Sequence, residues 1–224
     1  MKPDNFPAQI TGAVYGVILN DSDSLHRIGA ALTEAPYKGA PKAPVLYIKP
    51  ANTRIGGGAA INLPIGASAV EIGATIGVVI GAPAARVTLK NAAASIAGYV
   101  LVADLSLPHA SYYRPAIREK CFDNSCVISG DLLPAEKIAK TPALLITTQI
   151  NGRQVDTWAL ADLLRSIPEL LRDVTEFMTL QRGDLLLVGV KWQAPQAAPG
   201  DHVTLTAAGL GELNFRIAAA GGDK

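Results

Sequence analysis

The stretch "AVEIGATIGVVIG", residues 69–81, decides the fold class of this chain. It consists of small and β-branched residues, and its only charge is Glu71 near the start. A second apolar run, "GYVLVADLS" at 98–106, has the same character. Runs of this kind bounded by glycines are typical of buried strands. They predict a β-rich core in the middle of the chain.

Further β-rich runs, punctuated by Gly, Pro and Asn, lie on both sides of this centre. They are "TGAVYGVILN" at 11–20, "PVLYIKP" at 44–50, "ALLITTQING" at 143–152, "GDLLLVGV" at 183–190, "HVTLTAAG" at 202–209 and "GELNFRIA" at 211–218. Asn151-Gly152 predicts a tight hairpin turn because both residues tolerate positive φ. The last two runs predict a second hairpin. We expect an α+β chain with mostly antiparallel or mixed strands, and one domain over 1–224, because no segment reads as a linker.

Two segments carry helical signals. Apolar residues recur at helical spacing over 158–178 and predict a helix with one buried face. Pro168 interrupts that pattern, but Ser166 and Glu169 form a capping box with the proline in the first turn, so a second helix can start there. A shorter helix is predicted over 89–97.

The composition excludes several classes of partner. Twenty basic and nineteen acidic residues nearly cancel and form no blocks, which argues against nucleic acid and anionic lipid. The uncharged runs are too short for a membrane span, and "MKPDNFPAQ" at 1–9 lacks the apolar core of a signal peptide, so we expect a cytoplasmic protein. Cys121 and Cys126 are predicted to be plain thiols.

Known catalytic motifs are absent from the sequence. It contains no G-x-G-x-x-G after a strand, no G-x-x-x-x-G-K-[ST], no G-x-S-x-G and no H-E-x-x-H. His26 and His202 are interpreted as surface residues. His109 stays a candidate, because "ADLSLPHASYYRP" at 103–115 gathers an acid, a histidine, two tyrosines and an arginine in a predicted loop. On spacing alone this cluster is equally compatible with a plain loop.

The order of several segments resembles the fumarylacetoacetate hydrolase family over nearly the whole chain. The segments that carry the resemblance are "YIKPANTRIGGGAAINLP", "IGVVIGAPAARVTLKNAAASIAGYVLVADLS", "REKCFD", "INGR", "LQRGDLLLVG" and "PGDHVTL". "EAPYKGAPKAPVLYIKPANTRIG" and "SYYRPAIREKC" are similar to the N-terminal half of the two-repeat isomerase/decarboxylases of 4-hydroxyphenylacetate (homoprotocatechuate) catabolism. The resemblance implies a β-rich roll of mixed sheets with a few short helices.

The resemblance also implies a divalent cation, Mg²⁺ or Mn²⁺, bound by a Glu-x-Glu pair and a later Asp. The Asp is matched by Asp104, but the two glutamate positions fall on Gly73 and Thr75. Glu71 would share their strand face but lies two residues too far along the strand, so it is a secondary candidate for a metal ligand. We therefore expect no tight binding of a divalent cation to this chain alone.

Site residues follow from the same comparison. Lys120 in "REKCFD" matches a lysine of the family that contacts substrate, and it is the first catalytic candidate. Lys49, Tyr113 and Arg114 are candidates for binding substrate carboxylates. His109 is a candidate acid or base. The competing structural interpretation makes Asp104 a buried acid paired with Lys120 or Arg114.

Other family positions are changed. Pro108 stands where an arginine follows the Asp, and residues 188–191 read Val-Gly-Val-Lys in place of Thr-Gly-Thr-Pro. Ser24 and Arg27 stand where a His and a Glu follow Asn20.

Two functions remain open at this point. The resemblance implies a subunit of an isomerase/decarboxylase of di- or tricarboxylic 2-oxo or enol acids, working as a homodimer or beside a metal-binding homologous subunit. The alternative is a degenerate, non-catalytic partner that stabilises such a sister subunit.

Overall fold

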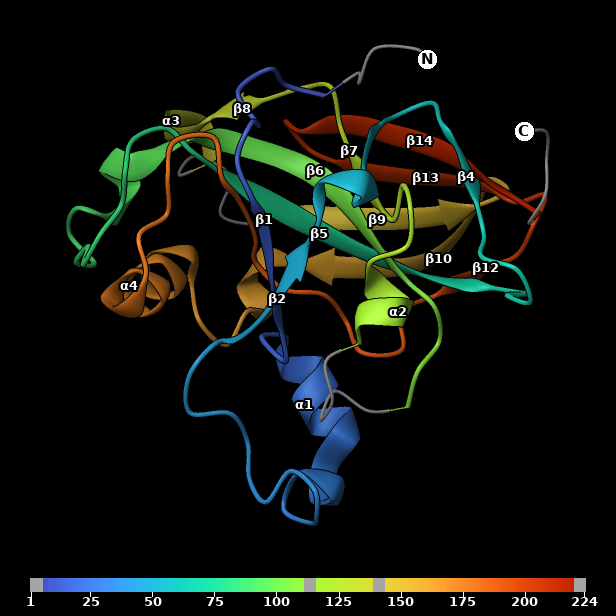
Figure 1. Cartoon of the computed structure of the whole chain (residues 1–224), viewed down its shortest axis with the longest axis horizontal. Coiled ribbons are helices and arrows are strands. Elements are labelled where there is room, and N and C mark those ends of the chain that lie inside the picture. The colour runs from blue at the N-terminus through green and yellow to red at the C-terminus, as the bar shows by residue number, and fades with distance from the viewer. Residues whose placement is uncertain (1–5, 111–115, 139–143, 220–224) are drawn as a thin grey trace.

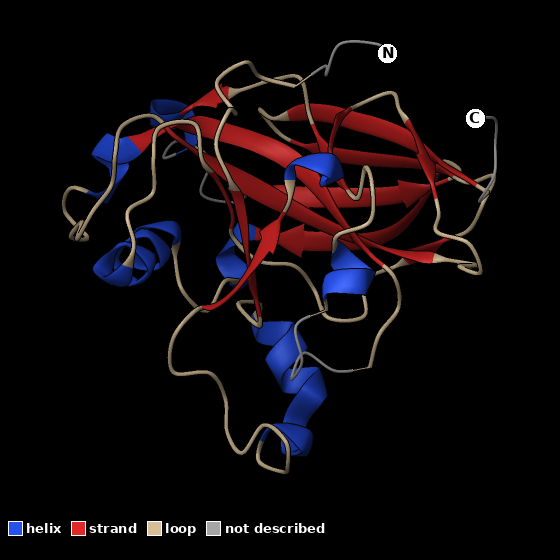
Figure 2. Cartoon of the chain, in the orientation of Figure 1, coloured by secondary structure: helices blue, strands red, loops and turns tan. Residues whose placement is uncertain are grey.

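The computed structural model describes residues 6–110, 116–138 and 144–219. Two β-sheets form the body of the molecule, and the helices lie at its periphery (Figures 1 and 2). The α+β class and the mixed-sheet roll expected from the sequence are confirmed. Among the described residues, no helix has the length and apolar character needed to cross a membrane.

The strands are short except for two of eleven residues in the centre. The strands are β1 (Val14–Ile18), β2 (Val45–Lys49), β3 (Arg54–Gly56), β4 (Ala60–Asn62), β5 (Val70–Ile80), β6 (Ile96–Ser106), β7 (Cys126–Ile128), β8 (Leu133–Pro134), β9 (Leu145–Ile150), β10 (Arg153–Ala159), β11 (Leu185–Leu187), β12 (Gln196–Ala197), β13 (His202–Ala207) and β14 (Gly211–Ala218). The α-helices are α1 (Ser22–Ile28), α2 (Ile117–Lys120), α3 (Ala135–Ile138) and α4 (Ile167–Phe177).

The larger sheet has the order β2-β1-β11-β5-β6-β7-β3, with β12 added beside β5 and β8 beside β6. The smaller sheet has the order β10-β9-β13-β14-β4. Most pairs are antiparallel, and β1–β11, β3–β7 and β4–β14 are parallel. β5 and β6 pair over almost their full length and form the spine of the larger sheet.

The two faces of β5 and β6 have different roles. Successive side chains of a strand point to opposite faces. Ile72, Ala74 and Ile76 of β5 belong to the main hydrophobic cluster, which also includes residues of the smaller sheet such as Leu205 and Phe215. The opposite face carries a small apolar cluster at one end, and Glu71, Gly73, Thr75, Asp104 and Ser106 at the other. The central strands therefore bury apolar residues on one face and polar residues on the other.

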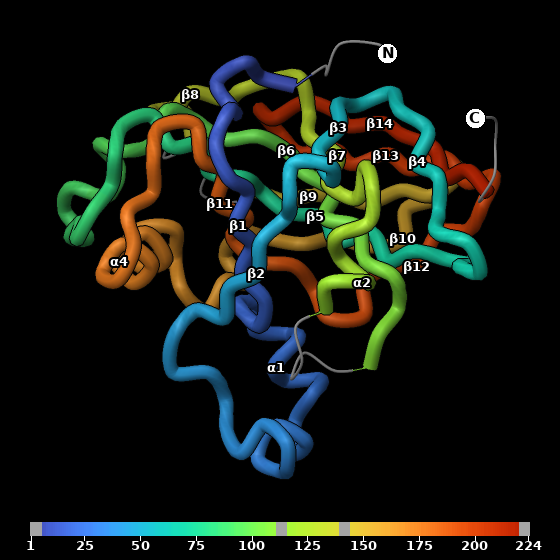
Figure 3. The backbone as a smooth tube through the Cα atoms, viewed as in Figure 1, coloured from blue at the N-terminus to red at the C-terminus, as the bar shows by residue number. Residues whose placement is uncertain are grey.

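The larger sheet curls so that β2 faces β6. Four strand spacings separate them, roughly 19 Å in a flat sheet, yet side chains of the two strands are in contact. Figure 3 shows the chain passing from β2 through a short turn into β3, which pairs with β7. The concave face of this half-barrel holds the polar residues of β6.

The hairpins and the capped helix expected from the sequence are confirmed. β9 and β10 pair around Asn151-Gly152, where both residues have positive φ. β13 and β14 form the second hairpin. Helix α4 begins after Ser166, and the Glu169 carboxylate accepts hydrogen bonds from the Ser166 amide at 2.8 Å and hydroxyl at 2.7 Å.

Two helical predictions were wrong. Trp158 lies in strand β10 and points into the core, so the helix does not begin before Ile167. Over 89–97 only residues 92–95 form a short 3₁₀ turn, after which β6 begins at Ile96 and pairs with Ile80 of β5. In both places, pairing within a sheet overrides local helical preference.

Candidate functional site

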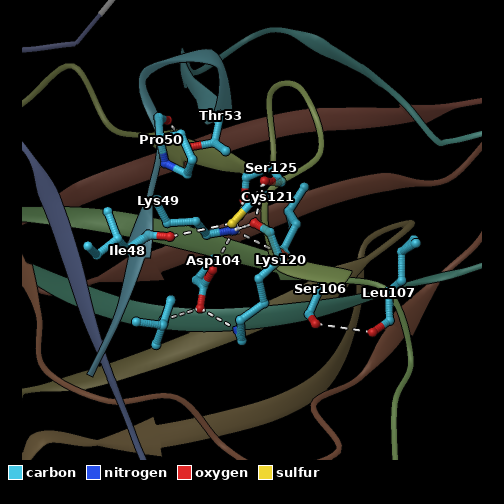
Figure 4. Close-up of polar contacts among 12 residues, drawn as sticks. Ile48, Lys49, Pro50, Thr53, Asp104, Ser106, Leu107, Lys120, Cys121 and Ser125 are labelled. Carbon is cyan, nitrogen blue, oxygen red and sulfur yellow. Dashed lines mark hydrogen bonds and ion pairs between the residues drawn. The ribbon is translucent and has the colours of Figure 1, made fainter. Parts of the chain in front are cut away.

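Asp104 is the centre of the candidate site. It lies near the end of β6 and is 1% exposed. One carboxylate oxygen, Oδ1, is 2.7 Å from the Nζ of Lys49, and the other, Oδ2, is 2.8 Å from the Nζ of Lys120 (Figure 4). The predicted pairing of Asp104 with Lys120 is present, and Lys49 joins it. Two ammonium groups thus share one buried carboxylate.

Lys49 is the more enclosed of the two lysines. Its side chain is fully buried. Besides Asp104, its ammonium lies within hydrogen-bonding distance of the carbonyl oxygens of Leu105 (3.0 Å), Lys120 (2.5 Å) and Ser125 (2.9 Å), and of the Ser125 hydroxyl (3.1 Å). Burial lowers the pKa of Lys49, and the nearby Asp104 carboxylate opposes this effect. Lys49 therefore connects β2, β6 and the turn after α2, and its predicted contact with substrate stays a prediction.

Tyr47 completes the group from the next inward-facing position of β2. Its hydroxyl donates a hydrogen bond to Oδ2 of Asp104, and the Lys120 ammonium lies 4.6 Å from the centre of its ring. Gly16 is its cross-strand neighbour on β1. A Cβ at Gly16 would lie 2.1 Å from the Tyr47 ring, so only glycine leaves space for the ring there. Sequence reasoning missed Tyr47, although its i, i+2 spacing to Lys49 on a strand indicates a shared face.

The two lysines determine the charge state of Asp104. Burial alone would raise the pKa of this carboxyl, but the ammonium groups of Lys120 and Lys49 outweigh burial and lower it to about 2. Asp104 is therefore ionised at neutral pH, and it holds the Lys120 ammonium toward the concave face.

The positions opposite Asp104 carry no carboxylate. Gly73 is its direct cross-strand partner on β5, and Thr75 lies two residues further along the same face. A Cβ at Gly73 would lie 2.5 Å from the Asp104 carbonyl oxygen and 3.1 Å from Cγ1 of Val190. The backbone of β6 and the Val190 side chain thus fill the space where a side chain at 73 would begin.

Glu71 and His109 lie at the same end of the two strands. Glu71 pairs across the sheet with Ser106, whose hydroxyl is 3.4 Å from Nδ1 of the half-buried His109. The Nδ1 atom is also 3.2 Å from the Leu107 carbonyl oxygen. The structure therefore brings His109 near the β6 end that carries Asp104. Tyr113 and Arg114 lie outside the described residues.

Burial raises the pKa of Glu71 to about 7, and the Lys120 charge opposes this rise. Because the folded state holds the proton more tightly than the unfolded state, Glu71 should make stability fall as the pH rises from about 4.5 to about 7. We expect Glu71→Gln to remove this slope and to raise the free energy of unfolding at pH 8 by about 2 kcal/mol, less than the roughly 3 kcal/mol that the full pKa rise corresponds to, because solvent screens part of the effect. Urea unfolding between pH 5 and 8 measures it, with the exposed Glu34→Gln as control. An unchanged slope in Glu71→Gln would contradict the assignment.

The two cysteines are free thiols, as the sequence predicts. Cys126 of β7 is the cross-strand neighbour of Asp104 and is fully buried. Burial raises the pKa of its thiol to about 12, although the Lys49 charge partly opposes this. Burial also raises the pKa of Cys121. Both groups are therefore poor nucleophiles at neutral pH.

The fold and the segment order match a known family. A family model described as the C-terminal part of fumarylacetoacetate (FAA) hydrolase matches residues 13–218. The chain belongs to the fumarylacetoacetate hydrolase family. A relative from Escherichia coli, the 4-hydroxyphenylacetate degradation bifunctional isomerase/decarboxylase, is 40% identical over 90% of this chain and 46% of its own length. The chain thus spans about half the length of this relative.

Solved structures of the family have the same fold. A 5-carboxymethyl-2-hydroxymuconate delta-isomerase from Mycobacterium smegmatis superposes with a TM-score of 0.78 at 25% identity, over 95% of this chain and 81% of that protein. A fumarylpyruvate hydrolase from Pseudomonas aeruginosa, solved with Mn²⁺ and pyruvate, gives a TM-score of 0.77 at 23% identity, over 93% and 90% of the two chains. This second likeness concerns the fold alone.

The donor set does not fit the divalent cation that the family implies. Such cations prefer several oxygen ligands, usually including more than one carboxylate. Here both oxygens of Asp104 are paired with ammonium groups, and the facing positions are Gly73 and Thr75. Within the described residues, no group of three or more His, Cys, Asp and Glu side chains is arranged to hold a metal ion. The site therefore does not suit a divalent cation, because its one carboxylate is already paired with two lysines and the facing residues offer no second carboxylate.

Proposed function

We propose that the chain is one unit of an isomerase/decarboxylase of homoprotocatechuate (4-hydroxyphenylacetate) catabolism. The proposed substrates are 2-hydroxyhepta-2,4-diene-1,7-dioate for isomerisation and 5-carboxymethyl-2-oxo-hex-3-ene-1,6-dioate for decarboxylation. The observation that carries the proposal is the Asp104–Lys120 pair, present on the concave face of a chain that is 40% identical to the Escherichia coli isomerase/decarboxylase. Both proposed substrates carry at least two carboxylates, which a buried cationic centre suits.

Lys120 is the residue that we expect to touch the substrate. Its ammonium is held by Asp104 and by the Tyr47 ring, and its side chain is 6% exposed. A cation fixed in this way is suited to a carboxylate or to the developing negative charge of an enolate, which isomerisation and β-oxo-acid decarboxylation share. Asp104 balances the charge of this lysine, and Asp104 and the Tyr47 ring together orient it. The roles of His109, Tyr113 and Arg114 stay predictions.

Lys49 takes a different part in this proposal from the one that the sequence suggested. Its ammonium is enclosed by protein oxygens, and its side chain has no exposed surface. We assign to it the role of a second, internal counter-ion of Asp104. A substrate anion could reach it only by displacing these contacts, at the cost of unpaired buried polar groups.

We propose that a second homologous unit with an intact Glu-x-Glu pair supplies the metal chemistry. The chain covers 46% of the Escherichia coli relative, which leaves room for one further unit of similar size in that protein. A divalent cation bound there would stabilise an enolate, whereas this chain would provide a cationic centre without metal.

A non-catalytic partner role is the second candidate. The observation that favours it is the combination of Gly73 and Thr75 with an Asp104 whose oxygens are both paired. In this case the Asp104 group would only hold the half-barrel together, and all chemistry would belong to the sister unit.

An activity assay of separated and combined units distinguishes these functions. The chain, a homologous chain that carries the Glu-x-Glu pair, and an equimolar mixture are each assayed with both substrates by the ultraviolet absorbance of the diene. If this chain is catalytic, the mixture performs both reactions and the sister chain alone lacks at least one. A folded sister chain that performs both reactions unaided, at the rate of the mixture, would favour the non-catalytic role.

A further inference from the structure

Two side chains of helix α1 bind the backbone amide and the backbone carbonyl of the same residue, Trp192. The Trp192 amide donates a hydrogen bond to the Ser24 hydroxyl at 2.8 Å. The Trp192 carbonyl accepts one from Nη2 of Arg27 at 2.7 Å. Ser24 and Arg27 are one turn apart on α1, so one short helix fixes the backbone of Trp192 from both sides. We call these two contacts the α1 clamp.

Ser24 is itself held in place. Its amide and its hydroxyl both donate to Oδ1 of Asp21, at 2.8 and 2.6 Å, and the side chain is fully buried. Because the hydroxyl uses its only proton on Asp21, its lone pairs are left to accept from Trp192. Arg27 is oriented by an ion pair with Asp23 at 3.1 Å. The clamp thus has a defined geometry on both sides.

A second anchor holds the other end of the same segment. The side-chain amide of Asn20 donates to the carbonyls of Val188 at 2.8 Å and Arg165 at 3.1 Å, and its oxygen accepts from the Arg165 amide at 3.0 Å. Asn20 and the α1 clamp therefore fix the backbone two residues before and two residues after Val190.

Val190 is the part of this segment that reaches the candidate site. It is 4% exposed, and its Cγ1 packs over Gly73, the cross-strand partner of Asp104. The neighbouring residues Lys191, Gln193, Ala194 and Pro195 line an open cleft of about 330 Å³ together with Arg27 and Asp156. The segment thus borders an open cleft, while its Val190 side chain packs against β5 at the cross-strand partner of Asp104.

We propose that Ser24 and Arg27 are positioning residues for the candidate site, which fix Trp192 so that Val190 stays packed over Gly73 and excludes water from the Asp104–Lys120 pair. They stand at two positions where the family pattern has a histidine and a glutamate. The packing of Val190 is independent of the proposed function, and its kinetic consequence rests on that function.

Two variants and one control test the clamp. Arg27→Met removes the contact to the Trp192 carbonyl from a partly exposed position, so the fold should survive, and Ser24→Ala removes the buried contact to the amide. Ser22→Ala makes the same chemical change as Ser24→Ala at an exposed position of α1. We expect amide exchange at Val190 and Trp192 to become about tenfold faster in both variants, because each loses one of the two hydrogen bonds that hold the Trp192 backbone, and to stay unchanged in the control.

A methyl NMR experiment reports the positioning itself. The nuclear Overhauser contact between the Val190 methyl groups and the Gly73 Hα should be present in the unaltered chain and in Ser22→Ala, and should weaken or vanish in Arg27→Met and Ser24→Ala. An unchanged contact and unchanged exchange in both variants would overturn the clamp, whether or not the assembly is active.

Kinetics with the sister unit completes the test. We expect kcat/KM for the diene dicarboxylate to fall about tenfold in Arg27→Met while the melting temperature changes little, with partial recovery in Arg27→Lys. Loss of the Val190 contact with unchanged kcat/KM would overturn the positioning role. An inactive assembly of unaltered chains would contradict the proposed function and leave the NMR result to decide the clamp.

Discussion

Asp104→Asn is expected to lower the free energy of unfolding by about 3 to 5 kcal/mol, the largest stability effect of any single substitution in the site. The change keeps the shape of the side chain but removes the only charge between two buried ammonium groups. Breaking a buried ion pair from one side is costly because the remaining charges stay desolvated without compensation. Lys49 has no exposed surface through which water could replace the lost partner.

Urea unfolding at pH 7 measures this effect against a matched control. Asp156 and Lys191 form an ion pair at the same distance, 2.7 Å, with side chains about 20% exposed. Asp156→Asn should therefore cost no more than about 1 kcal/mol. Adding Lys49→Met to Asp104→Asn should recover part of the loss, because it removes one uncompensated charge. Equal costs for the two asparagine variants would contradict the buried pairing.

The free energy of unfolding at acid pH gives an independent check of the charge state of Asp104. The pKa of Asp104 is lowered to about 2, so the folded state binds its proton less tightly than the unfolded state. The resulting stability, about 2 kcal/mol, is present above pH 4 and is lost as the pH falls toward 2. Asp104→Asn should lack this component of the acid transition.

Lys120→Met is expected to reduce kcat of the proposed assembly with the homologous unit by about 100-fold or more, the size of effect seen when one donor to a developing oxyanion is removed. The change leaves Asp104 paired with Lys49, so the chain should still fold. Methionine has a similar length and no charge. The loss should therefore reflect the missing ammonium rather than a cavity.

Three measurements make this result interpretable. Lys90→Met, at an exposed position, should leave kcat unchanged, and Lys120→Arg should retain part of the activity because the positive charge remains. Thermal unfolding establishes that the Lys120→Met chain is folded. A reduction of less than about threefold in a folded assembly would favour the non-catalytic partner role over a catalytic centre in this chain.

Much of the fold was predictable because the strongest local signals agree with the final packing. The runs at 70–80 and 96–106 pair as β5 and β6, and Asn151-Gly152 forms its hairpin. The helical prediction from Trp158 failed because apolar spacing cannot tell a helix from a strand followed by a turn. Trp158 is instead buried on β10. The alanine-rich segment before β6 failed because pairing of Ile96 with Ile80 takes precedence over local preference.

The site was predictable only where single residues carry their own signal. Asp104 and Lys120 were identified from segment resemblance, and their ion pair is present. Tyr47 was missed because its contact requires the curl of the sheet that brings β2 opposite β6. The enclosure of Lys49 was missed for the same reason, since its acceptors come from segments more than fifty residues away.

We infer that protein ammonium groups, and no divalent cation, balance the charge of Asp104 in this chain. Isothermal titration of Mn²⁺ into the purified, folded chain tests it most directly, with and without 2-oxoglutarate as a dicarboxylate 2-oxo acid. We predict no binding at micromolar concentrations in either titration, because both Asp104 oxygens are paired and the facing positions are Gly73 and Thr75. Stoichiometric micromolar binding that Asp104→Asn abolishes would contradict the account.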